Sequence, residues 1–414
     1  MWRRRLLVCA ALLGGHADGA RAQAVTQRGF VEGAATAFPR RAPADPTRGV
    51  ADLLVRDEVF VAPAAWIQLA AGFEARANSH RQVDTSWRFD FSDRGVRRPR
   101  LSVRRLSATM TRGPVTVDVG KQFIRWGRTD IVSPTDRFAP RDFLNVVDSE
   151  FLAVTGVRGT VQAGSETVEA AWVPRVTPSR SPLVDQRWGV LPSGPPGLSL
   201  VEAPPEFGAA QGGIRWRRTA GAAEYSVSFF DGVNHLPDIR LEVREPPGPA
   251  PIVEVTRVYP RIRTYGVDWE RPVPWFTIKV EAAYLTSPSR STDEYGLYVL
   301  QVERQRGEWM FIGGYAGEVG GRRRSALTFA PDRGISRALV ARVSRTLDPT
   351  RTFDLEGAVR QNGRGAYAKA EYSQARGQHL RATITAVAIG GRRDDFLGQY
   401  RHNSHLALTV RFSF

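Results

Sequence analysis

The sequence has very little that would support redox, metal or nucleophilic chemistry. Its single cysteine is Cys9, and none of the residues that follow it is a cysteine. The chain beyond Cys9 therefore offers no disulfide, no thiolate nucleophile and no thiolate metal ligand. It also contains no Gly-x-Ser-x-Gly elbow and no His-Glu-x-x-His zinc motif. We expect no metal, no cofactor and no enzymatic activity.

Histidine is scarce as well. The histidines after residue 22 are His80, His235, His379, His402 and His405. His402 and His405 are three residues apart, which on a strand places them on opposite faces. A shared metal ion is therefore not expected at this pair.

Long apolar runs are missing after the N-terminal segment, so we expect no transmembrane helix. The N-terminal segment begins Trp-Arg-Arg-Arg at residues 2–5, continues with an apolar stretch at 6–13, and has small residues at Ala20 and Ala22. This pattern is typical of a secretory signal peptide. We expect a signal peptide at residues 1–22, with cleavage after Ala22 or Ala24, and a single domain over residues 25–414.

Acidic residues are outnumbered by basic ones, 42 to 58, which gives a formal charge of +16. Residues 1–22 contain four Arg and one Asp, so their removal leaves +13. Only three of the basic residues are lysines, a bias that a GC-rich genome would produce without any function. The positive sign still favours anions as partners. No basic helix or aromatic RNA-binding motif is present, so nucleic acid is not an expected partner.

The pattern that is present is alternation with a period of two. In the last ten residues, Leu406, Leu408, Val410, Phe412 and Phe414 alternate with more polar positions. On a strand this gives one apolar and one polar face.

Similar segments occur in pairs along the chain, and very short turns rich in Gly or Pro join the two members of each pair. The eight pairs are 50–61 with 65–77, 100–111 with 115–126, 151–163 with 167–174, 209–218 with 222–231, 256–270 with 275–286, 294–304 with 308–317, 335–345 with 351–361, and 365–375 with 378–389. Longer polar segments separate the pairs.

Short turns that alternate with long loops are typical of a transmembrane β-barrel. Many segments reach about ten residues, the length of a strand that crosses a bilayer at a tilt. The eight pairs give 16 strands, and segments 29–38 and 402–414 raise the number to 18. We predict an all-β fold, a transmembrane antiparallel up-and-down barrel of 16 to 18 strands, with 18 favoured. The alternative is a soluble β-sandwich or β-helix, whose strands are usually nearer five or six residues.

Two segments resemble parts of known proteins. Residues 120–127 read Gly-Lys-Gln-Phe-Ile-Arg-Trp-Gly and lead into a loop with Pro-Thr-Asp at 134–136. This segment resembles one in porin-like outer-membrane barrels, including alginate-export-like and uncharacterised families. The terminal strand, with Val410, Phe412 and Phe414, resembles the assembly signal of Gram-negative outer-membrane barrels.

The resemblance implies a channel in the outer membrane of a Gram-negative bacterium. A charged interior and the charge of +13 predict passive diffusion of small polar or anionic solutes. The expected partners are outer-membrane lipid, lipopolysaccharide, whose phosphates the positive charge attracts, and the barrel-assembly machinery, which the terminal strand implies. The oligomeric state stays open between a monomer and a homotrimer. The alternatives are a structural or plugged outer-membrane barrel and, with less support, a barrel hydrolase.

The loop at 127–150 is a candidate constriction, and Ser133 followed by Pro134 predicts that a short helix begins there. The candidate constriction residues are Arg125, Arg128, Asp130, Asp136, Arg137, Arg141 and Asp142. The candidate residues facing the barrel interior are Asp118, Arg158, Arg215, Arg217, Lys279, Glu281, Arg342, Lys369, Arg381 and Arg411. Both signs of charge occur, so we expect ion-pair ladders along the inner wall.

Overall fold

The computed structural model describes residues 24–189, 199–202, 210–244, 252–322, 329–361 and 363–414. The signal peptide expected at residues 1–22 lies outside these ranges. The helices within them are α1 (Pro331–Gly334) and the 3-10 helix η1 (Gly398–Asn403). Neither is long and apolar enough to cross a membrane.

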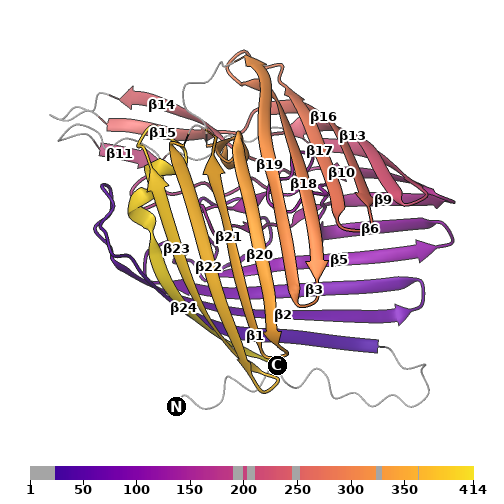
Figure 1. The fold of residues 1–414 in the computed structure, drawn as a ribbon, viewed down its shortest axis with the longest axis horizontal. Coiled ribbons are helices and arrows are strands. Elements are labelled where there is room, and N and C mark those ends of the chain that lie inside the picture. The colour runs from indigo at the N-terminus through magenta and orange to yellow at the C-terminus, as the bar shows by residue number, and fades with distance from the viewer. Residues whose placement is uncertain (1–23, 190–198, 203–209, 245–251, 323–328, 362) are drawn as a thin grey trace.

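Eighteen strands of the described residues form one closed antiparallel barrel (Figure 1). This is the favoured strand number. The barrel strands are β1 (Ala24–Ala37), β2 (Gly49–Ala64), β3 (Ile67–Asn78), β5 (Leu101–Arg112), β6 (Val115–Gln122), β9 (Val154–Ala163), β10 (Glu166–Val173), β12 (Gln211–Ala220), β13 (Ala223–Val233), β16 (Arg261–Pro272), β17 (Thr277–Thr286), β18 (Glu294–Arg306), β19 (Trp309–Arg322), β20 (Ala338–Asp348), β21 (Arg351–Arg360), β22 (Gly365–Arg376), β23 (Leu380–Gly391) and β24 (His405–Ser413).

The barrel closes where β1 pairs with β24. The register runs from Phe30 opposite Ser413 to Ala37 opposite Leu406, while the other edge of β1 pairs with β2. Each barrel strand thus has two hydrogen-bonded neighbours, and the sheet has no free edge.

Very short turns join neighbouring strands at one end of the barrel, where Figure 1 also shows the C-terminus. Gly113 and Gly164 adopt positive φ angles of 58° and 60° in two of these turns, a conformation that favours glycine. The predicted pairing of segments into hairpins is therefore confirmed. The first turn lies slightly later than expected, because β2 continues to Ala64.

Several of the predicted strands are wrong in extent. The first strand begins at Ala24 and not at residue 29, and the last begins only at His405, because residues 398–403 form η1. The segment 256–270 is divided, because its first residues belong to β15 (Ile252–Val258) and β16 begins only at Arg261, after Pro260. Proline has no N–H to donate to a ladder, which accounts for the break. The segment 115–126 ends as β6 at Gln122, and the chain then leaves the wall.

A small sheet lies at the end with the long loops. In it β14 (Asp238–Arg244) pairs with β15 in antiparallel fashion, and β11 (Ser199–Glu202) pairs with β15 in parallel. Figure 1 shows these strands beyond the barrel wall, at the upper left. The other short strands are β4 (Phe89–Asp90), β7 (Arg141–Asp142) and β8 (Glu150–Phe151).

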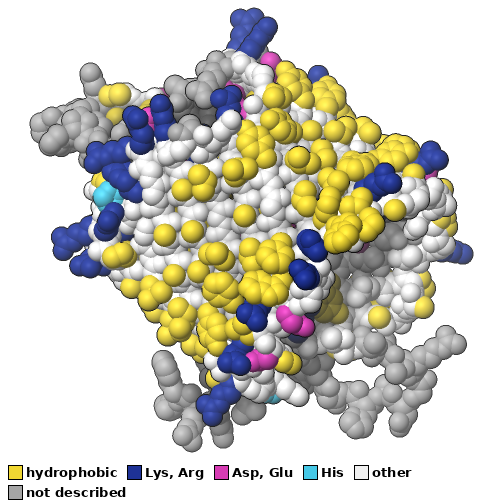
Figure 2. Space-filling model, viewed as in Figure 1, with side chains coloured by type: hydrophobic (Ala, Val, Ile, Leu, Met, Phe, Trp, Pro, Cys, Tyr) yellow, Lys and Arg dark blue, Asp and Glu magenta, His cyan; other side chains and the backbone are white. Residues whose placement is uncertain are grey.

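The outer face of the wall is apolar. In β24 the apolar residues from Leu406 to Phe412 point outward, whereas Ala407, Thr409 and Arg411 line an internal cavity. Outward-facing apolar side chains of other strands include Leu69, Leu106, Val119, Ile214, Val267, Leu300, Leu339 and Ile384. Figure 2 shows hydrophobic side chains over the strands on the viewer's side.

The last residue packs on the first strand. Gly29 and Phe414 exchange two backbone hydrogen bonds, of 3.0 and 2.9 Å. A side chain at Gly29 would collide with the Phe414 ring, because an added Cβ would lie 2.4 Å from it. The glycine therefore provides the space for the terminal aromatic ring.

We predict that Gly29→Val weakens the contact between β1 and β24. Overpacking of this kind costs about 1–3 kcal/mol, which should lower the melting temperature of the detergent-solubilised barrel. Gly33→Val is the matched control, because Gly33 lies on the same strand with open space around its α-carbon. Equal melting temperatures for the two variants would contradict the prediction.

Candidate functional site in the barrel interior

Residues 123–153 connect β6 to β9 and fold into the barrel, and we call them the inward loop. A fully buried carboxylate on β17, Glu281, holds the first part of this loop. It accepts backbone N–H bonds from Arg128, Thr129 and Thr135, at 2.8, 2.9 and 2.8 Å. The hydroxyls of Thr129, Ser133 and Thr135 donate to it as well, at 2.8, 3.0 and 2.8 Å. A buried charge is costly unless its hydrogen bonds are made, and here six donors satisfy both oxygens.

The helix predicted to begin at Ser133 is not formed, and the described residues 127–150 contain none. The Ser133 hydroxyl donates to Glu281 instead of capping a helix. Asp136 accepts from the backbone N–H groups of Trp126 and Gly127, at 2.5 and 2.8 Å. The side chains of Ser133 and Asp136, which would suit the start of a helix, thus bind other segments of the chain instead.

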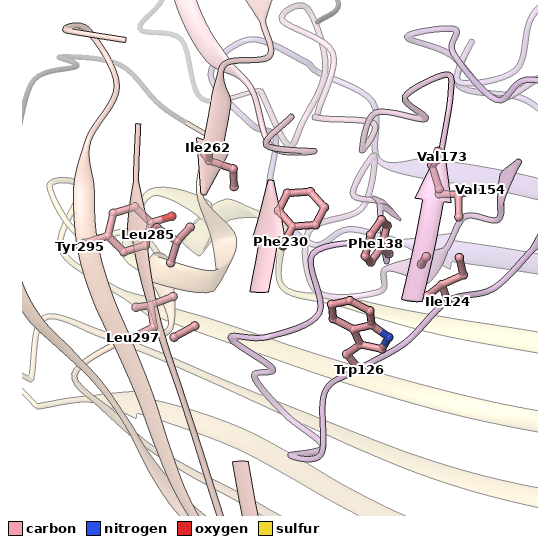
Figure 3. Packing of buried hydrophobic residues seen from close by; sticks show 12 residues of the cluster. Ile124, Trp126, Phe138, Val154, Val173, Phe230, Ile262, Leu285, Tyr295 and Leu297 are labelled. Atoms are coloured by element: carbon pink, nitrogen blue, oxygen red, sulfur yellow. The ribbon is translucent and has the colours of Figure 1, made fainter. Parts of the chain in front are cut away.

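The inward loop covers an apolar core on the side of β9 to β18. Phe138 packs edge-on between Trp126 and Phe230, with ring centroids 5.0 and 4.9 Å apart (Figure 3). The other large residues of this core are Ile124, Val154, Val173, Ile262, Leu285, Tyr295 and Leu297. Phe143 is also buried, beside Leu236 and Phe329. This side of the interior is filled with protein.

Charged residues of the inward loop pair with the wall behind it. Arg128 forms ion pairs with Glu224, Asp268 and Glu270, at 3.1, 2.6 and 2.8 Å. Asp130 pairs with Lys279 at 3.2 Å. Arg137 is buried, donates to the Pro134 carbonyl at 2.8 Å and lies 3.5 Å from Asp332. These three candidates are neutralised by local partners.

Asp142 belongs to a buried cluster that joins the inward loop to the 175–189 segment. It pairs with Arg98 at 2.9 Å and with Arg180 at 3.2 Å. Arg180 also pairs with Asp93, which in turn pairs with Lys121, at 2.7 and 2.6 Å. Burial disfavours the charged form of Asp142, but the two guanidinium groups outweigh this effect and lower its pKa to about 2.

Arg125 and Arg141 lie over the ring of Phe151, at 4.2 and 3.9 Å from its centroid. Arg125 also pairs with Asp136 at 3.2 Å. Arg141 forms no ion pair with a carboxylate within the described ranges. Burial lowers the pKa of Arg141 to about 10, and the nearby Arg125 adds to this effect. The stacked rings and guanidiniums hold positive charge at a fixed place.

The inner wall carries the expected ion-pair ladders. The pairs that involve the candidate residues are Asp118 with Arg158 at 2.8 Å, Arg215 with Asp268 at 2.9 Å, Arg217 with Glu224 at 3.2 Å, Lys279 with Glu303 at 2.5 Å, Arg342 with Asp354 at 3.4 Å, Lys369 with Glu371 at 3.3 Å, and Arg411 with Glu32 at 2.5 Å. Arg381 differs from the others, because its contact is with the Ser373 hydroxyl at 3.1 Å. No carboxylate of the described residues pairs with it.

An internal cavity of about 500 Å³ lies on the opposite side of the barrel from the apolar core. Strands β1 to β3 and β22 to β24 line it, together with residues 145–150 of the inward loop. Its basic lining residues include Arg56, Arg76, Lys369, Arg381 and Arg411, and its acidic lining residues include Glu32, Asp52, Asp148, Glu150 and Glu371. The structure thus brings three of the candidate wall residues together here. None of the seven candidate loop residues lines this cavity.

A five-residue charge cluster that the sequence patterns do not predict lies beside this cavity. Glu150 pairs with Arg76 at 2.6 Å, with Arg104 at 2.8 Å, and with Arg56. Glu74 pairs with the same three arginines. Alternation within the predicted strands places Glu74 and Arg76 on one face, so part of the cluster was detectable. Glu150 follows an irregular loop, and no local pattern indicates its partners.

Nothing matches the sequence among protein-family models or curated proteins. The structure is similar to OccAB4 of Acinetobacter baumannii, with a TM-score of 0.55, 10% identity, and coverage of 95% of this chain and 98% of that one. It is similar to OpdQ of Pseudomonas aeruginosa, with a TM-score of 0.56, 8% identity, and coverage of 95% and 99%. It is also similar to a BenF-like porin of Pseudomonas fluorescens Pf-5, with a TM-score of 0.55, 8% identity, and coverage of 95% of this chain and 98% of that one. The chain therefore has a porin-like barrel fold.

We predict that Glu281→Gln releases the inward loop. The amide keeps the shape but replaces one acceptor oxygen with a donor, so that several loop donors lose their partner. Breaking a buried charged network of this kind costs about 3–5 kcal/mol. Trypsin should then cut the folded, detergent-solubilised protein faster after Arg128, Arg137 or Arg141. Glu58→Gln, on the far wall, is the control, and equal cleavage rates in the two variants would refute the anchoring role.

We predict that Asp142 stabilises the fold only while it is ionised. Its pKa in the folded protein, about 2, lies below the ordinary value of 3.8. The stabilisation is therefore present above pH 4 and is lost as the pH falls from about 4 to 2. The shift corresponds to about 2 kcal/mol. The stability of wild type should exceed that of Asp142→Asn at neutral pH, and the difference should shrink across this window. A constant difference would contradict the assignment.

Proposed function

We propose that this protein is an outer-membrane channel for passive diffusion of small polar or anionic solutes. The observation that carries the proposal is the closed ladder of eighteen strands with an apolar outside and a charged inside. In hydrocarbon every backbone N–H and C=O needs a partner, and a closed barrel provides one without helices. The likeness to solved porin structures supports the same function.

In the proposed orientation the short hairpins face the periplasm and the long loops face the outside, as in other outer-membrane barrels. The apolar outer face then contacts lipid and, in the outer leaflet, lipopolysaccharide. Residues 1–22 act as the export signal, and the barrel-assembly machinery recognises the terminal strand through Val410, Phe412 and Phe414. Assembly into a homotrimer stays a hypothesis.

We further propose that the pathway prefers anions. Arg381 has no carboxylate partner among the described residues and lines the internal cavity beside Arg411. The Phe30 ring lies between the guanidinium groups of Arg411 and Arg56, at 4.2 and 5.3 Å. Positive side chains along a pore attract anions and set selectivity.

A plugged or structural barrel is the second candidate. The inward loop fills one side of the interior with an apolar core, and this observation favours a narrow or closed passage. The proposal includes no catalytic role. Ser179 and His235 share a hydrogen bond of 2.8 Å, but Ser179 is fully buried. Burial, together with Arg137 and Arg141, lowers the pKa of His235 to about 3, which makes it a weak base.

Planar-bilayer recording tests the proposal. Purified protein is expected to produce discrete current steps, with a reversal potential in a salt gradient that indicates anion preference. Arg381→Ala should reduce this preference, because it removes from the cavity wall a cation that pairs with no carboxylate of the described residues. Arg125→Ala should alter the conductance if the inward loop borders the pathway. Arg112→Ala, in a short turn, serves as the control.

The outcomes separate the candidates. The absence of current steps from inserted protein would favour the plugged barrel. Clear cation preference would contradict the proposed selectivity while leaving the channel intact. Unchanged currents in Arg125→Ala would place that side chain away from the pathway.

A further inference from the structure

A group of basic and aromatic side chains lies on the outer face of the barrel, at the hairpin between β18 and β19. We call it the basic-aromatic patch, and it consists of Arg304, Arg306, Trp309, Phe311 and Arg345. Cross-strand register places Arg304 opposite Phe311, and places Trp309 between Arg306 on one side and Arg345 on the other. The patch is therefore fixed by the hydrogen-bond ladder of three neighbouring strands.

The side chains of the patch point away from the barrel interior. Leu300 and Val302 on β18 are exposed outward, and the strand period places Arg304 and Arg306 on the same face. Trp309 and Phe311 are exposed as well, with stacked rings 5.7 Å apart. Figure 2 shows Lys and Arg side chains among hydrophobic ones near this hairpin.

Two of the three arginines lie over aromatic rings. Arg345 lies 4.8 Å from the centroid of Trp309, and Arg304 lies 5.7 Å from that of Trp275. None of the three forms an ion pair with an acidic side chain of the described residues. By contrast, the inward-facing basic residue Lys279 on the neighbouring strand pairs with Glu303.

Arg304, Arg306, Trp309 and Phe311 also surround a hollow of about 530 Å³ on this outer surface. Exposed arginine on a lipid-facing wall is costly near the bilayer centre and is tolerated near the interface, where an anion can approach it. Exposed Trp and Phe side chains mark that interface. The hollow thus combines guanidinium donors, which suit a phosphate, with an aromatic floor that suits acyl chains.

We propose that the basic-aromatic patch binds the phosphate headgroup of an anionic glycerophospholipid. The inference rests on the proposed membrane placement, in which the short hairpins lie at the periplasmic side. The leaflet at that side presents glycerophospholipids, and lipopolysaccharide lies at the opposite end of the strands. The guanidinium groups of Arg304 and Arg306 contact the phosphate, and Trp309 and Phe311 contact the glycerol and the first methylenes.

Lipid binding to the full-length, detergent-solubilised barrel tests the proposal by native mass spectrometry. The probes are phosphatidylglycerol, phosphatidylcholine, lipid A and inorganic phosphate. Phosphatidylglycerol is expected to bind most tightly. In the triple variant R304Q/R306Q/R345Q its apparent affinity should fall at least about tenfold, because each basic residue near an anionic headgroup contributes on the order of 1 kcal/mol.

The double variant R112Q/R376Q is the matched control. Arg112 and Arg376 also lie at short turns, and the register pairs them with the outward-facing Val115 and Leu380. This variant should bind phosphatidylglycerol like wild type. The single variant R306Q, at the tip of the hairpin, should show a smaller loss and provides a second test if the triple variant does not fold.

Three results would overturn the inference: equal binding of phosphatidylcholine and phosphatidylglycerol, unchanged binding in the arginine variants, or tighter binding of lipid A. Inorganic phosphate that competes as well as the lipid would assign the site to free phosphate instead. Conductance in neutral bilayers is measured in parallel. Protein that conducts but binds no anionic lipid refutes the headgroup site alone, whereas protein that never inserts refutes the membrane placement on which both proposals rest.

Discussion

A closed barrel requires that its first and last strands pair, and the rest of this structure depends on that pairing. Between β1 and β24 the register runs without interruption from Phe30 to Ala37. Once this ladder is complete, side chains need only alternate between an apolar outside and a polar inside. Gly29 contributes by leaving space for the Phe414 ring at the end of the ladder. The fold thus relies on backbone hydrogen bonds more than on a single large core.

The interior follows a second rule, which is that charges inside the barrel are paired. Opposite charges on neighbouring strands form ion pairs within the wall itself, as Asp118 and Arg158 do. The inward loop extends this network across the interior, because Arg128 and Asp130 form ion pairs with charged side chains on β13, β16 and β17. Against this background a cation without a carboxylate partner, such as Arg381, stands out as a candidate for contact with solutes.

Local patterns predicted the strands because alternation and turns depend on neighbouring residues. The hairpins, the strand number and the apolar face of β24 were all predictable in this way. Local patterns failed where a distant partner decides the structure. The local pattern at Ser133 predicts a helix cap, whereas the partner of its hydroxyl, Glu281, is 148 residues away. Alternation predicts one strand over 256–270, but its first part belongs to β15, which pairs with β11 and β14 in a separate sheet. Glu150 has no local signal either, although alternation places its partner Arg76 on one face with Glu74.

The anchoring of the inward loop by Glu281 has a consequence for the order of folding. The loop precedes β17 in the chain, yet the six hydrogen bonds that hold it converge on a side chain of that strand. The loop therefore has no binding site until the strands that surround it have paired. The contacts to Glu281 span 146 to 153 residues of the chain. Docking of the inward loop, which narrows the interior, therefore cannot precede the placement of β17 beside its neighbouring strands.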